Sequence, residues 1–408
     1  MAKLDSTTTT TPYEFKEARS MEEAEHSWKC HSNLTNMLEN VHYVKDEYSY
    51  EDLQRIELQR REILQCVELP FWRILTFWNG TCLKALSHDL LIWVPITIYV
   101  AVRIQAHFGA AMPEMAELMS QTDTNILGGF LSFLLVLFVN QTNNRFFEMY
   151  NLARACGGRI QDIAGLAHTY LQRKQPERVD RLVRYLNSAQ IAGYVGLSGS
   201  PYSQSNFFDP INEQHHMLTQ QDLDRLKHDT EMNDGPACFK ELIRWCHEEL
   251  GLALEEGAIS DNQSVQIQEK LLGLRITMDG IYNAVDQQPH FFYIHFLCLL
   301  SALYLPIFAV ENAFTAGWGD ESSWVVEILT GTIVILQSFF VVGLRLLGQK
   351  LADPFGDDLE DLSIMTYVLG TIKSTKILLS KNGSAPALKD ETVQKAKAPE
   401  RFPLYNLA

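Results

Sequence analysis

The chain has 408 residues, of which 46% are hydrophobic and 21% are charged, and its formal net charge is −16 at pH 7. This acidic balance argues against a nucleic-acid-binding protein, which normally presents a basic face. The seven cysteines are widely and irregularly spaced and include no CxxC pair, so neither a zinc ribbon nor a disulfide framework is indicated.

The two ends of the chain are polar and lack a sustained apolar face. Residues 1–60 begin with a Thr run and carry several acids, which is not typical of a signal or transit peptide. Residues 366–408 finish in Ser, Gly, Ala, Pro and Lys without helical periodicity. We expect both segments to be cytosolic tails, the first of them partly disordered.

Four blocks of the sequence are apolar enough to cross a bilayer, which takes roughly 20 residues of helix. Two of them contain no Asp, Glu, Lys or Arg, and a third contains only Glu327. The first block is weaker, because extending the apolar stretch Leu90–Val102 upstream takes in Asp89 and Lys84. A buried helix of a large soluble protein is the alternative for any one block, but no soluble core needs four. The predicted spans are residues 83–103, 125–144, 290–310 and 322–344.

The distribution of basic residues predicts the orientation of these spans. The connections 104–125 and 311–323 contain no Lys or Arg. Arg145 follows the second span, and Arg345 follows the fourth. The positive-inside rule therefore places both termini and the middle segment 145–289 in the cytosol.

The middle segment contains stretches in which apolar residues recur at three- and four-residue spacing, as in RVDRLVRYLNSAQIAGYVGL and ACFKELIRWCHEELGLALEEG. No alternating strand pattern of useful length occurs in the sequence. We predict an all-α, four-span membrane protein whose membrane helices continue into a large helical cytosolic region.

Four stretches together are similar to one family of membrane proteins. They read FWRILTFWNGTCLKALSHDLL, GGFLSFLLVLFVNQTNNRFFEMY, PHFFYIHFLCLLSALYLPIF and LRLLGQKLADPFGDDLEDL, and the DPFG followed by spaced acids is the most specific of them. These stretches occur in the same order, and with the same topology, as in the bestrophin family of pentameric anion channels, and the chain therefore resembles that family. The resemblance covers residues 61–365, which we expect to form the channel domain.

The resemblance implies a homopentamer that passes chloride and other small monovalent anions, with bicarbonate as a further candidate, passively through one axial pore. The plasma membrane is the expected location. The residues that match the family's apolar neck are Gly129, Phe133 and Leu137, here called the neck stripe. They recur every four residues and so share one face of a helix. The family usually has a bulkier residue at the first of these positions, so we expect a neck that is one ring shorter, or wider, at its outer end. Without the resemblance, a stripe that packs against neighbouring helices would be the simpler interpretation.

A second, lower constriction is implied immediately before the third span. The matching residue is Gln288, which precedes Pro289. Its amide group would donate hydrogen bonds to an anion. The alternative is an ordinary solvated glutamine at the entrance of a helix.

The acidic stretch after DPFG suggests a regulatory Ca²⁺ site. Carboxylate and carbonyl oxygens on a sharp turn suit calcium, and the resemblance implies Asp358 and Asp361 as side-chain ligands, with backbone carbonyls near Lys350, Asp353 and Leu64–Gln65. Two observations oppose this interpretation. Acids in the first turn of a helix are favoured by the helix dipole without a metal, and Leu359 interrupts a run that is denser in calcium-dependent members of the family.

The sequence offers no catalytic motif. It contains no HxxxH or HExxH pattern, no GxxxxGK[ST] and no GxSxG, so we do not expect an enzyme. The rival to a channel is a non-conducting membrane scaffold or assembly factor with the same fold. The expected partners are the lipid bilayer, further copies of the chain and small anions, and not nucleic acid.

Overall fold

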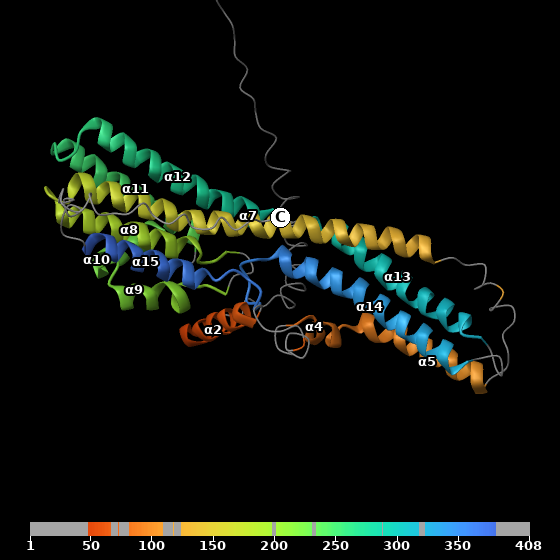
Figure 1. The fold of residues 1–408 in the computed structure, drawn as a ribbon. Coiled ribbons are helices and arrows are strands. Elements are labelled where there is room, and N and C mark those ends of the chain that lie inside the picture. Colours follow the sequence, from red (N-terminus) through yellow and green to blue (C-terminus); the bar gives the residue numbers. More distant parts are fainter. Residues whose placement is uncertain are drawn as a thin grey trace, which may run out of the picture. The chain divides into compact units, whose positions relative to one another are not determined.

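The computed structural model describes residues 48–66, 72, 81–108, 117, 124–197, 201–230, 234–287, 289–317 and 323–380, all within one compact unit (Figure 1). The regular elements of these ranges are helices, without a strand, as the sequence predicts. In chain order they are α2 (Tyr50–Cys66), α4 (Cys82–His88), α5 (Leu90–Phe108), α7 (Asn125–Leu171), α8 (Pro176–Gly193), the short π-helix η1 (Gln204–Phe208), α9 (Asp209–His215), α10 (Gln220–Asp229), α11 (Gly235–Glu255), α12 (Asp261–Asp286), α13 (Phe291–Thr315), α14 (Trp324–Ala352) and α15 (Ile364–Ser380).

Within these ranges, four helices are long and apolar enough to cross a membrane: α5, α7, α13 and α14. The second predicted span falls inside α7, and the third and fourth match α13 and α14 except that they begin one and two residues before these helices. The first differs, because the chain forms the short helix α4 and then restarts as α5 at Leu90 instead of running on from residue 83. Asp89 causes the break: its backbone N–H bonds to the carbonyl of Leu86, while its carboxylate accepts the N–H of Leu91 at 2.9 Å. It thus ends one helix and caps the next.

Helix α7 joins two separate hydrophobic cores. Its first part packs with α13 and α14, which in turn pack with α5, and its second part packs with α8, α12 and α15 (Figure 1). Leu135 and Phe138 belong to the core of the membrane-length helices, whereas Met149 and Ile160 belong to the other core. The predicted continuation of a membrane helix into a second helical region is therefore present as one uninterrupted helix of 47 residues.

The packed part of the chain extends past both boundaries expected for the channel domain. Helix α2 lies largely before residue 61, and its Leu53 is buried in the second core. Helix α15 lies almost wholly beyond residue 365, and Val368 and Ile372 are buried in the same core. Helix α2 has few apolar positions, so its sequence alone resembles a polar tail, whereas α15 has an apolar face that the boundary at residue 365 left out of the channel domain.

Gly235, the first residue of α11, lies close to the backbone at the C-terminal end of α8. A Cβ atom added at Gly235 would lie 2.0 Å from the backbone oxygen of Val195 and 2.5 Å from that of Ala192. A Cβ added at Gly251, in the same helix, would meet nothing within 4 Å.

We expect Gly235→Ala to destabilise the protein by about 1–3 kcal/mol, because backbone atoms must shift to admit the methyl group. Thermal unfolding of purified protein measures the effect. Gly251→Ala is the matched control and should be neutral or stabilising by up to about 1 kcal/mol, since alanine favours the helix. Equal melting temperatures for the two variants would contradict the close packing of α11 on α8.

Candidate functional site

The neck stripe lies on the face of α7 that is turned away from its own subunit. The Phe133 and Leu137 side chains are 61% and 38% exposed, and a Cβ at Gly129 would meet nothing within 4 Å. At 3.6 residues per turn, the centre of the stripe lies roughly 180° from the centre of the buried face. That buried face consists of Gly128, Leu131, Leu135, Phe138 and Thr142. The stripe therefore does not pack against the helices of the same chain.

The exposed apolar surface of α7 is wider than the neck stripe alone. Phe130 is 65% exposed and Val136 is 51% exposed, one on either side of the stripe. Only 28–33% of the apolar windows of the four membrane-length helices is buried. Apolar surface of this extent must be covered by lipid or by other subunits.

The inner end of the stripe becomes polar and is tied to the segment that precedes Gln288. Asn140 and Asn144 are exposed on the same face of α7. The next residue, Arg145, donates to the carbonyl of Gln287 and to that of Ala352, the latter at 3.3 Å. Arg145 thereby joins α7 to the ends of α12 and α14. Gln288 itself lies outside the described residues.

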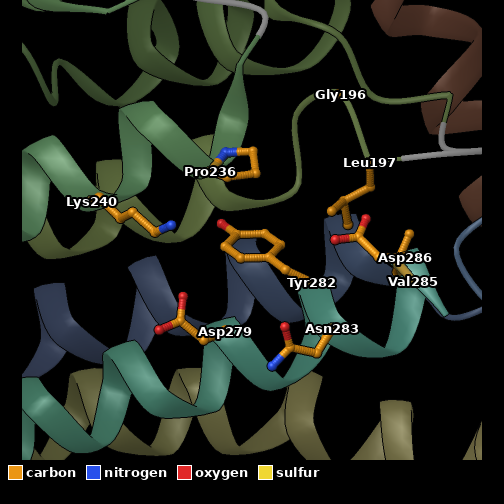
Figure 2. A pocket seen from close by; sticks show the side chains of 9 residues that line it. All are labelled: Gly196, Leu197, Pro236, Lys240, Asp279, Tyr282, Asn283, Val285 and Asp286. Carbon is orange, nitrogen blue, oxygen red and sulfur yellow. The ribbon is translucent and has the colours of Figure 1, made fainter. Parts of the chain in front are cut away.

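A polar cavity of about 450 Å³ opens beside the end of α12, lined by Gly196, Leu197, Pro236, Lys240, Asp279, Tyr282, Asn283, Val285 and Asp286. Figure 2 shows the Tyr282 ring reaching from α12 toward Pro236 and Lys240 on α11. The charged side chains that line the cavity are one lysine and two carboxylates, and none of the described lining residues is a serine, cysteine or histidine.

The acidic stretch forms a compact turn between α14 and α15, here called the acidic turn (residues 353–361). The N–H of Leu362 bonds to the carbonyl of Pro354 at 2.9 Å, and the N–H of Asp358 bonds to the carboxylate of Asp361 at 2.7 Å. A Cβ at Gly356 would lie 2.9 Å from that same carboxylate, so a larger residue there would have to displace it. Phe355 is 1% exposed and anchors the turn in the second core.

The two predicted calcium ligands are engaged by protein groups. Asp358 accepts from Lys350 at 3.3 Å, and Lys350 also binds Glu360 at 3.0 Å. The Asp361 carboxylate is buried, 3.8 Å from the guanidinium of Arg60. Burial raises the pKa of Asp361 to about 8, and the neighbouring Arg60 opposes this rise.

No group of three or more His, Cys, Asp or Glu side chains in the described part of the chain is arranged to hold a metal ion. Because Asp361 faces Arg60 and Asp358 faces Lys350, their carboxylates do not converge on one cation. These residues by themselves do not fit a calcium ion.

At the opposite end of the membrane-length helices, a buried charge cluster joins α5, α13 and α14. Arg103 on α5 binds Glu327 on α14 and donates to the carbonyl of Ala313 on α13 at 3.0 Å. His107 lies 2.9 Å from the same glutamate, and the Tyr99 hydroxyl donates to its backbone carbonyl at 2.7 Å. The sequence contained a signal for this cluster: one arginine and one glutamate, each inside an apolar helix, must be paired or face water.

The described part of the chain is thus all-helical, with four helices long and apolar enough to cross a membrane, and one of them, α7, continues into a second helical region. A family model described as "Bestrophin, RFP-TM, chloride channel" matches residues 60–377. The chain belongs to the bestrophin family.

Known relatives are similar to this chain over most of its length. Bestrophin homolog 24 of Caenorhabditis elegans is 21% identical over 346 residues, which make up 82% of this chain and 54% of the worm protein. This chain therefore spans about half the length of that relative. Crystal structures of a bacterial bestrophin homolog from Klebsiella pneumoniae, among them a single-residue mutant, share the fold. The mutant matches with a TM-score of 0.59 at 14% identity, covering 71% of this chain and 98% of the bacterial one. A second structure has a TM-score of 0.58, also at 14% identity, and covers 72% and 98%.

Proposed function

We propose that this protein is a passive anion channel, a homopentamer in the plasma membrane with both termini in the cytosol. It passes chloride and other small monovalent anions, with bicarbonate as a further candidate, down their electrochemical gradients. Family membership supports the class of protein. The observation that carries the proposal is the neck stripe, whose Phe133 and Leu137 are exposed on the face of α7 opposite its packing face.

Copies of this face around a common axis would form apolar rings one helical turn apart. Such rings offer no fixed charge to trap an ion, and they can gate by dewetting. A partly dehydrated anion can meet the positive edge of the Phe133 ring. At Gly129 the absence of a side chain leaves the outer end wider, and Asn140 and Asn144 offer amide donors at the inner end.

We assign the lower constriction to Gln288, whose amide N–H groups would donate to a passing anion. The preceding residue, Gln287, has its carbonyl held by Arg145. Because Arg145 also binds Ala352, the end of α12 is connected to the start of the acidic turn through one side chain.

One chain supplies one copy of the neck stripe, so a pore lined by this face requires several chains around an axis. We expect the purified protein in mild detergent to have the mass of five copies of the 46.5-kDa chain. Native mass spectrometry, or light scattering corrected for detergent, measures this. A monomer or dimer under all mild conditions would remove the pore.

Anion flux distinguishes the channel from a non-conducting scaffold of the same fold. Protein reconstituted into chloride-loaded vesicles should release chloride when an outward gradient is imposed and potassium is made permeable with an ionophore. Protein-free vesicles give the background. Release at the background rate from vesicles that contain intact pentamers would favour the scaffold.

A further inference from the structure

Arg60 of α2 places a buried positive charge at the centre of the acidic turn. The residue is only 3% exposed. Its Nε and Nη2 atoms donate to the carbonyl of Asp358 at 3.0 and 2.8 Å, Nη2 donates to that of Gly356 at 3.0 Å, and Nη1 donates to that of Leu362 at 3.0 Å. The Asp361 carboxylate lies 3.8 Å from Nη2.

The oxygens around Arg60 are the type that a hard divalent cation would take from a turn. Three backbone carbonyls and one carboxylate converge on a single cationic group, and calcium sites in proteins are built from these same two oxygen types. Here a guanidinium, whose donors form a rigid planar fork, fills that centre. Two further carboxylates of the turn, those of Asp358 and Glu360, are held by Lys350.

We propose that Arg60 closes the acidic turn in place of a calcium ion, so that the turn is ordered and the channel operates without calcium. The part concerning conduction rests on the proposed channel function, whereas the part concerning the turn does not.

Further side-chain contacts fasten α2 and the residue Tyr48 before it to the turn and to the start of α15. The Tyr48 hydroxyl binds Asp357, and Thr366 of α15 binds both Glu57 and Arg61 of α2, the latter at 2.8 Å. The turn follows directly on Ala352, whose carbonyl is held by Arg145 beside the lower constriction. Arg60 is therefore a positioning residue: it holds the turn that adjoins the inner end of the pathway.

Thermal unfolding of the full-length protein in detergent, with a chelator or with about 1 mM free calcium, tests the closure of the turn, because this concentration saturates sensor-type sites. We expect the melting temperature of the wild type to be the same in both conditions. Arg60→Met should lower it by about 5 °C or more, because three carbonyls and a carboxylate lose their buried partner. The matched control is Arg55→Met on the same helix, since Arg55 is 73% exposed and pairs with Asp52 at the surface. Its melting temperature should change by no more than about 1 °C.

Two results would overturn the proposal: a wild-type melting temperature that calcium raises by several degrees, or an Arg60→Met variant that melts like Arg55→Met. If Arg60→Met does not fold, the wild-type comparison still decides between Arg60 and calcium. In bilayer recordings the wild-type current should be equal in chelator and in calcium, and a current that appears only with calcium would refute the claim about conduction. Absence of current in both conditions would count against the channel function, while the melting experiment would still test the turn.

Discussion

Phe133→Ala combined with Leu137→Ala is expected to increase the chloride current of the assembled channel by roughly tenfold or more. The two truncations widen the apolar neck and allow it to wet, and each reduction of the barrier by about 1.4 kcal/mol multiplies the rate tenfold. Because both side chains are exposed in the subunit, their loss should leave no cavity within it. Single-channel recording of the double variant, together with its thermal unfolding, measures both effects.

Leu135→Ala is the matched control for this experiment. Leu135 lies on the same helix but is fully buried against the other membrane-length helices. Its truncation should cost about 2–5 kcal/mol of stability without increasing the current. If the double variant instead behaved like this control, with lower stability and unchanged current, the stripe would be a packing surface and not the neck.

The second large effect is expected at the buried cluster around Arg103. Arg103→Met should destabilise the protein by about 3–5 kcal/mol, because it leaves the Glu327 carboxylate and the carbonyl of Ala313 without their buried cation. Thermal or denaturant unfolding in detergent measures the change. Arg275→Met is the control: Arg275 and its partner Asp279 are 52% and 36% exposed, so its loss should cost no more than about 1 kcal/mol.

Adding Glu327→Gln to Arg103→Met should restore part of the lost stability, since the carboxylate that has lost its arginine is then also removed. A single Arg103→Met variant as stable as Arg275→Met would show that the cluster does not hold α5, α13 and α14 together.

Composition and spacing were sufficient to predict the class of fold. Apolar length alone located the second, third and fourth spans, because no other arrangement accommodates such long uncharged helices. The start of the first span was misplaced because the break depends on Asp89, whose carboxylate caps the following helix at Leu91. Helix α2 was interpreted as part of a tail because it has few apolar residues of its own. Helix α15 was left out because the family resemblance was drawn only to residue 365, although Ile364, Val368 and Ile372 share a buried face.

The candidate site could be predicted only in part, because its contacts depend on how distant helices pack together. Four-residue spacing put Gly129, Phe133 and Leu137 on one face, but which face of α7 packs within the subunit follows from the positions of α13 and α14. The cation of the acidic turn could not be found by inspecting the acids, because Arg60 lies 298 residues before Asp358 in the chain. Pairings at such separation depend on the whole fold.

The reversal potential of purified protein in a planar bilayer, recorded under a tenfold gradient of potassium chloride, tests the proposed function most directly. A chloride-selective pore should give discrete currents that reverse near the chloride equilibrium potential, about 59 mV from zero. Phe133→Ala with Leu137→Ala should enlarge these currents. Reversal near the potassium potential, of opposite sign, or the absence of current from verified pentamers would contradict an anion channel with its neck at Phe133 and Leu137.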